Sequence, residues 1–160
     1  MSVNLKDSLL QNNSIRLKQK VATWQEAVKL GTDILEANGT ITPDYYQAIL
    51  KCEAEHGPYF HLCPGLAMPH ARPEDGVKVN SFALVTLEEP VALSDGSLVD
   101  VFITLAGADN NSHMNALMQI MSTIEDEESD DGVDLERLRS CSSVEDVIKV
   151  IDTYVVTTEE

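Results

Sequence analysis

The spacing of apolar residues changes from helical to strand-like near residue 57, and this change is the feature that most constrains the fold. Upstream of it, apolar residues between Ala27 and Leu35 recur every three or four positions, as in a helix with one buried face. Downstream, the runs 81–87 and 99–105 are rich in β-branched and aromatic residues, which is typical of strands. A chain that changes period in this way predicts helices packed on a sheet.

Two helices are expected before the change. Thr23 and Glu26 form a capping-box pattern at the start of the first, in which each side chain accepts a hydrogen bond from the other residue's backbone amide. The second is expected to begin with Thr42 as its N-cap and Pro43 in its first turn, and to end near His56.

Further elements are expected on both sides of the strand-rich centre: a short strand at 14–17 and two closing helices at 112–124 and 143–154. The acidic stretch 125–134 between those helices predicts a solvated connection. The sequence therefore predicts an α/β fold, a three-layer sandwich with a central mixed β-sheet flanked by helices on both faces. By length we expect one domain over residues 1–160.

A stripe of methionines lies within the first of these closing helices. Met114, Met118 and Met121 recur at helical spacing, and we expect them in the core and not on a binding surface.

The chain carries 27 acidic and 11 basic side chains, a formal charge of −16. This balance argues against nucleic acid and anionic membranes, whose phosphates attract Lys and Arg, and suits a partner with a basic surface. No apolar run approaches the roughly 20 residues that span a bilayer, and the first residues lack the apolar core of a signal peptide. Three cysteines, an odd number, favour a reducing compartment. We expect a cytoplasmic protein without direct membrane insertion.

Residues 65–73, Gly-Leu-Ala-Met-Pro-His-Ala-Arg-Pro, place a histidine just after a short apolar strand. Pro69 fixes φ, removes a backbone donor and biases Met68 toward an extended conformation. The strand should therefore stop at Met68, and His70 should project past its end. A stiff backbone suits a histidine that reacts in one direction, so we take His70 as the candidate catalytic nucleophile.

His113 is the second candidate, because it follows the polar turn 107–111 at the start of a helix. Sites in open α/β sheets gather beyond strand ends, so His70 and His113 could share one crevice. A dianionic phosphate on His70 would need donors, which His113, the Arg72 guanidinium and backbone amides at the helix start can supply. We expect Arg72 to bind phosphate, although the pattern fits it equally well as a solvated surface charge.

No cofactor or metal is expected, since transfer between protein side chains needs no metal and no carboxylate cluster is typical of magnesium. A zinc-binding domain unrelated to phosphate is a further alternative, with Cys52, His56, His61 and Cys63 as ligands. Their spacing matches no common zinc motif, which argues against it.

The motif Gly-Leu-Ala-Met-Pro-His-Ala at 65–71, with Asp-Asn-Asn-Ser-His at 109–113, resembles the type-2 enzyme IIA domains of the bacterial sugar phosphotransferase system, the mannitol/fructose class. The similarity covers almost the whole chain, and residues 56–77 most resemble the L-ascorbate-specific members. The resemblance implies a phosphotransferase in which His70 takes phosphate from the phosphocarrier protein HPr and passes it to a cysteine of a IIB component, serving the IIC permease indirectly. It also implies that His113 is the second active-site histidine, which orients or stabilises the phosphorylated one.

In mannitol-type members an arginine near the end of the second helix assists, whereas here Cys52 falls at about that place. Our hypothesis is that Arg72 supplies the missing cation. The alternative function is a regulatory IIA-like module in which the phosphorylation state of His70 signals to a partner protein. The sequence leaves open the oligomeric state, a homodimer included, and whether IIB and IIC are separate chains.

Overall fold

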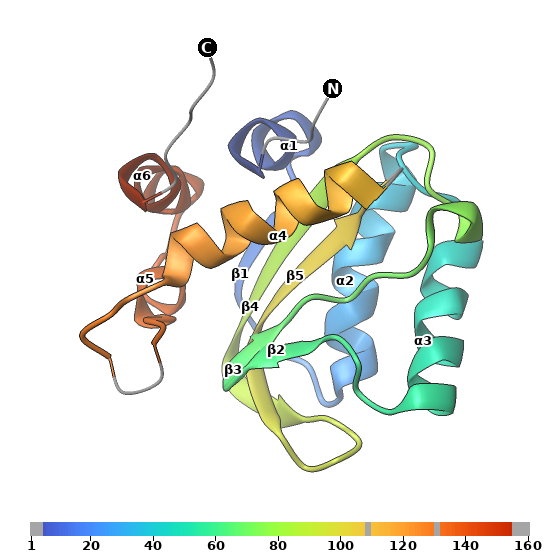
Figure 1. The fold of residues 1–160 in the computed structure, drawn as a ribbon, viewed down its shortest axis with the longest axis horizontal. Helices are drawn as coiled ribbons and strands as arrows, with labels where there is room; N and C mark the ends of the chain where they lie inside the picture. Colours follow the sequence, from blue (N-terminus) through green and yellow to red (C-terminus); the bar gives the residue numbers. More distant parts are fainter. Residues whose placement is uncertain (1–4, 108–109, 130–131, 155–160) are drawn as a thin grey trace.

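A computed structural model describes residues 5–107, 110–129 and 132–154, and its centre is a mixed sheet (Figure 1). Within these residues the sheet has five strands in the order β1-β4-β5-β3-β2. β1 pairs in parallel with β4, and β3 with β5, whereas β4–β5 and β2–β3 pair antiparallel. The strands are β1 (Ile15–Gln19), β2 (His61–Cys63), β3 (Gly65–Ala67), β4 (Ser81–Ala92) and β5 (Leu98–Ala106).

Helices cover both faces of the sheet, which gives three layers (Figure 1). One face carries α1 (Leu5–Asn12), α4 (Asn110–Ile124), α5 (Glu136–Arg139) and α6 (Val144–Tyr154), and the other carries α2 (Trp24–Ala37) and α3 (Asp44–His56). The predicted three-layer α/β sandwich with a mixed sheet is confirmed. None of the helices in the described ranges has the length and apolar content needed to cross a membrane.

Alternation along the central strands creates one apolar core on each side of the sheet. In β4, Phe82 and Leu84 pack with α1, α4, α5 and α6, whereas Ala83 and Val85 pack with α2 and α3. All four side chains are buried, because both faces of the sheet are covered. This double burial explains why β4 and β5 are near-continuous apolar runs in the sequence.

The two predicted helix starts differ from expectation in detail. At α2 the Thr23 hydroxyl accepts from the Glu26 amide, as predicted, but the Glu26 carboxylate accepts from Ala22 N at 2.8 Å and not from Thr23. At α3 the N-cap residue is Pro43, and Thr42 makes no side-chain cap. The Thr42 amide instead donates to Gly76 O at 2.8 Å. The residue that was expected to cap α3 therefore binds the loop that follows His70.

The methionine prediction was wrong for two of its three members. Met114 and Met118 are 57% and 66% exposed, whereas Met121 is partly buried against the core. The side chains of α4 that pack against the sheet include those of Ile120 and Ile124. Met114 and Met118 lie four residues apart on a neighbouring row, so helical spacing alone did not show which row is covered.

Candidate active site around His70

His70 lies where the sheet brings two strand ends together. β3 and β5 run in parallel side by side, so the segments that follow them leave the same edge of the sheet. β3 ends at Ala67, one residue before the predicted end, and Leu105 N donates to Pro69 O at 2.9 Å. This contact joins the His70 segment to the end of β5, and the carboxyl ends of strands are where α/β sheets form their sites.

The backbone from Met68 to Arg72 is held at every residue, which gives the His70 segment a fixed course. The partners come from separate parts of the chain: the segment before β2, the end of β5, helix α3 and the turn after His70. The bonds are Met68 N to Phe60 O, Leu105 N to Pro69 O, Tyr59 OH to His70 O, Ala71 N to Tyr45 OH and Arg72 N to Asp75 Oδ2. The rigid mounting that the proline implied therefore extends over the whole motif.

The imidazole of His70 is half-buried, and its own contacts define which nitrogen can react. Nδ1 lies 2.8 Å from the carbonyl oxygen of Met68. A carbonyl oxygen only accepts hydrogen bonds, so this contact requires the proton on Nδ1 and leaves the lone pair on Nε2. The ring of Tyr59 meets the imidazole edge-on, with centroids 5.2 Å apart and planes at 73°. In a neutral imidazole held in this way, Nε2 is the nitrogen that carries the lone pair.

Arg72 is directed by the structure toward carboxylates of its own turn. Its Nε lies 3.4 Å from Asp75 and its Nη1 3.8 Å from Glu74, both in the short 3₁₀ turn η1 (Pro73–Asp75). The hydrogen bond and charge of Asp75, followed by the charge of Glu74, raise the pKa of Arg72. The side chain is 72% exposed, and exposed ion pairs of this kind are weak, so the guanidinium can exchange one anionic partner for another.

Comparison with known proteins identifies what this arrangement belongs to. Residues 8–154 match the family described as "Phosphoenolpyruvate-dependent sugar phosphotransferase system, EIIA 2". The chain belongs to this family. Membership makes it a phosphotransferase component that carries phosphoryl groups for sugar uptake.

Similar proteins extend over nearly the whole EIIA chain. The "Ascorbate-specific PTS system EIIA component" of Shigella boydii is 50% identical over 153 residues, covering 94% of this chain and 96% of that protein. The IIA candidate PtxA of Streptococcus mutans is 40% identical with a TM-score of 0.86, and 95% of each chain is covered. Escherichia coli enzyme IIA-Mtl, solved in complex with phosphorylated enzyme IIB-Mtl, is 26% identical with a TM-score of 0.72, covering 88% of this chain and 94% of that one.

The second predicted histidine of this EIIA chain lies in the first turns of α4, but the side chain of His113 lies outside the described part of the structure. The backbone supports the predicted neighbourhood, since α4 follows β5 at the same edge of the sheet where His70 follows β3. Cys52, at about the place of the arginine in mannitol-type members, is half-buried on α3. It lies close enough to Tyr45, Tyr59 and Arg72 to interact with each electrostatically, which places it among the residues around His70.

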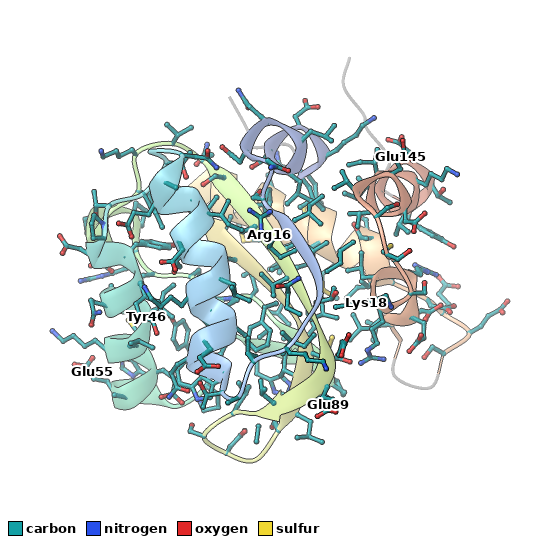
Figure 2. All side chains as sticks on the ribbon, turned by 180° about the vertical axis from the view of Figure 1, so that it is seen from behind. Arg16, Lys18, Tyr46, Glu55, Glu89 and Glu145 are labelled. Atoms are coloured by element: carbon teal, nitrogen blue, oxygen red, sulfur yellow. The ribbon has the colours of Figure 1, made fainter. Side chains whose placement is uncertain are left out.

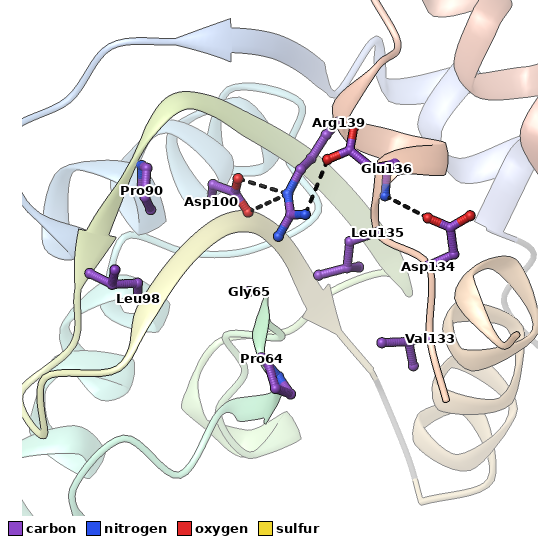
Figure 3. A pocket seen from close by; sticks show the side chains of 10 residues that line it. All are labelled: Pro64, Gly65, Pro90, Leu98, Asp100, Val133, Asp134, Leu135, Glu136 and Arg139. Carbon is purple, nitrogen blue, oxygen red and sulfur yellow. Dashed lines mark hydrogen bonds and ion pairs between the residues drawn. The ribbon is translucent and has the colours of Figure 1, made fainter. Parts of the chain in front are cut away.

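A pocket of about 320 Å³ lies elsewhere, where β3 and β5 begin and α5 packs on them (Figure 3). Its wall contains an ion pair between Arg139 and Asp100, with Nε 2.8 Å from the carboxylate, and Glu136 also contacts the guanidinium. Because Gly65 begins β3 and His70 follows its end, this pocket is separated from the imidazole by the length of the strand. It is not part of the His70 site.

Sequence reasoning missed two residues that build the site, Tyr45 and Tyr59. A signal was available for Tyr45, because a tyrosine on a buried helix face needs a partner for its hydroxyl. The sequence did not show that the Tyr45 hydroxyl reaches Ala71 N or that the Tyr59 hydroxyl reaches His70 O, since both contacts depend on tertiary packing. Among the described residues, no group of three or more His, Cys, Asp or Glu side chains is placed to hold a metal ion.

Proposed function

We propose that this EIIA chain accepts a phosphoryl group from phospho-HPr on Nε2 of His70 and passes it to a cysteine of a IIB component. The observation that carries the proposal is the contact between His70 Nδ1 and Met68 O, within a backbone that is fixed on both sides. It fixes the imidazole in one orientation at the edge of the sheet, with Nδ1 as the protonated nitrogen and Nε2 as the one that attacks phosphorus.

The transfer consists of two in-line displacements at phosphorus. In the first, the Nε2 lone pair of His70 forms a bond to phosphorus as the bond between phosphorus and the HPr histidine breaks. The imidazole gains positive charge, and the Nδ1 proton, already hydrogen-bonded to Met68 O, lets the carbonyl dipole stabilise that charge. In the second, a thiolate of IIB forms a bond to phosphorus as the bond to Nε2 breaks, which restores the neutral imidazole.

Three groups near His70 are proposed to stabilise the phosphoryl oxygens. His113 enters from the start of α4, whose first amides also carry the positive end of the helix dipole. Arg72 would exchange Glu74 or Asp75 for the phosphoryl group, two residues from its attachment point. Arg72 would thereby supply the cation that mannitol-type members take from the position of Cys52.

L-Ascorbate uptake is the proposed pathway, because the curated relatives with 48–50% identity are ascorbate-specific components. The chain itself need not touch the sugar, since it exchanges phosphate with proteins only. We propose that residues 1–160 act as one domain in the cytoplasm, with the IIC permease served through IIB.

The experiment is incubation with enzyme I, HPr and labelled phosphoenolpyruvate, followed by addition of the IIB component. Wild type should take up one label and lose it to IIB, and His70→Gln should take up none. Gln is the probe of choice because it keeps approximate size and polarity without the nucleophile. Arg72→Ala should be labelled more slowly and lose its phosphate sooner by hydrolysis.

Equal labelling of wild type and His70→Gln would refute the role of His70. An unchanged rate and an unchanged phosphohistidine lifetime in Arg72→Ala would refute the role of Arg72. Stable labelling of wild type without onward transfer to IIB would instead favour the regulatory module.

A further inference from the structure

Two tyrosine hydroxyls from different elements hold the peptide group that joins His70 to Ala71. Tyr45, on α3, accepts a hydrogen bond from Ala71 N at 2.9 Å and lies 2.7 Å from Leu105 O. Tyr59, just before β2, donates to the carbonyl oxygen of His70. Two carbonyl oxygens lie within reach of the Tyr45 hydroxyl, Leu105 O at 2.7 Å and Ala71 O at 3.3 Å. A hydroxyl has one proton, so Tyr45 donates it to the nearer, Leu105 O, and accepts from Ala71 N.

These contacts connect the His70 loop to the end of β5 and to the segment just before β2. Tyr45 joins the loop at Ala71 to the end of β5, the strand that leads into α4. Tyr59 holds the peptide of His70 itself, and its ring lies edge-on to the imidazole. Both phenols keep their proton at neutral pH, and burial raises the pKa of each further above its ordinary value.

We propose that Tyr45 and Tyr59 are positioning residues for the phosphoryl transfer of His70. By fixing the peptide at His70 and Ala71, they keep the imidazole where its Nδ1 proton reaches Met68 O, and so present Nε2 to the incoming phosphorus in one direction. The inference rests on the proposed function for its kinetic consequence, but not for its effect on the imidazole.

The physical reason is the directional demand of the reaction. In-line displacement requires the attacking lone pair to be aligned with the bond that breaks, and small misplacements reduce rates strongly. The Met68 contact alone leaves the loop free to shift together with the imidazole, because donor and acceptor are two residues apart in the same segment. The bonds at Met68 N and Pro69 O hold the residues before His70, and the two tyrosines hold the peptide group that follows it, which ties the segment to α3 and to the β2 side.

The test uses Tyr45→Phe and Tyr59→Phe, which remove only the hydroxyls. The matched control is Tyr46→Phe on the same helix, since the Tyr46 hydroxyl contacts Gln25 O at 3.3 Å and its side chain lies between α3 and α2, away from the His70 loop (Figure 2). The first readout is the rate of labelling by phospho-HPr below saturation. The second is the tautomer of His70, read from the ¹⁵N chemical shifts of its two ring nitrogens in the unphosphorylated protein.

Both site variants should be labelled at least about tenfold more slowly than wild type, while Tyr46→Phe stays within about twofold. In wild type the proton of His70 should be on Nδ1, and in the site variants part of the population should carry it on Nε2. A merely structural role would lower the unfolding midpoint without changing the tautomer.

Unchanged rates, or slower labelling with the wild-type tautomer, would overturn the proposal. If wild type itself takes up no label, the proposed function fails, and the tautomer measurement still decides the positioning. If Tyr45→Phe does not fold, Tyr59→Phe decides alone, since the Tyr59 side chain is only half-buried.

Discussion

Gly65 begins the strand that carries His70, and its replacement by alanine tests how that strand is packed. Gly65 has φ +90°, a left-handed conformation that costs an L side chain about 1–2 kcal/mol. A Cβ there would also lie 2.4 Å from Arg139 Nη2 and 2.8 Å from Leu135 Cδ1, so both side chains would have to move. Overpacking of this kind adds about 1–3 kcal/mol. Gly65→Ala should therefore lower the free energy of unfolding by about 2–5 kcal/mol.

Gly96 provides a matched control, because its φ is +89° and no atom lies within 4 Å of its hypothetical Cβ. Gly96→Ala carries only the backbone penalty, so the difference between the two variants isolates the clash at about 1–3 kcal/mol. At roughly 2–4 °C per kcal/mol, thermal unfolding should resolve it, with urea unfolding as a second measurement. Adding Arg139→Ala to Gly65→Ala removes one of the two clashing side chains. The extra loss of unfolding free energy relative to Gly96→Ala should therefore become smaller. Equal shifts for Gly65→Ala and Gly96→Ala would show that Arg139 and Leu135 do not pack over β3.

Three further outcomes follow from charge and exposure. Met118→Ser should change the free energy of unfolding by less than about 0.5 kcal/mol, because the side chain is exposed, and a loss above about 2 kcal/mol in urea unfolding would restore its predicted core position. Asp146 accepts from Ser142 N, which lowers its pKa, so its contribution to stability is present above the ordinary carboxyl pKa and is lost as pH falls through its lowered value. Asp146→Asn should accordingly show a shallower loss of stability on acidification than wild type, and parallel curves would contradict this. The chain has a formal charge of −16, and screening shortens the range of charge attraction to about 8 Å at physiological ionic strength. The rate of labelling by phospho-HPr below saturation should therefore fall as the salt concentration is raised. A salt-independent rate would make the charge incidental to docking.

The parts of the fold that the sequence predicted are those with strong local signals. β4 and β5, which are buried on both faces, are continuous apolar runs in the sequence, and α2 and α3 have clear start and end signals. These signals were enough to predict a sheet layer covered by helices. The short elements α1, β2 and α5 were not predicted. Helices and strands of this length are stabilised by packing on a sheet already in place, and their own residues carry little periodic signal.

The site shows the same division between local and distant information. Pro69 predicted a fixed histidine at a strand end, because its effect on the backbone is local. The contacts of Tyr45 with Ala71 and Leu105 span 26 and 60 residues, and no spacing rule connects them. The sequence predicts Arg72 as a phosphate-binding residue or a solvated surface charge, and it does not show the contacts with Glu74 and Asp75, which form only through the 3₁₀ turn.

The central claim is that the site uses Nε2 of His70 because Met68 O holds the proton on Nδ1. The most direct measurement is ¹⁵N and ³¹P NMR of the protein phosphorylated by enzyme I and HPr, with ¹⁵N-labelled histidine. The account predicts a single phosphohistidine at His70, with phosphorus coupled to Nε2 and a proton retained on Nδ1. Phosphorus on Nδ1 of His70, or on another residue, would contradict it.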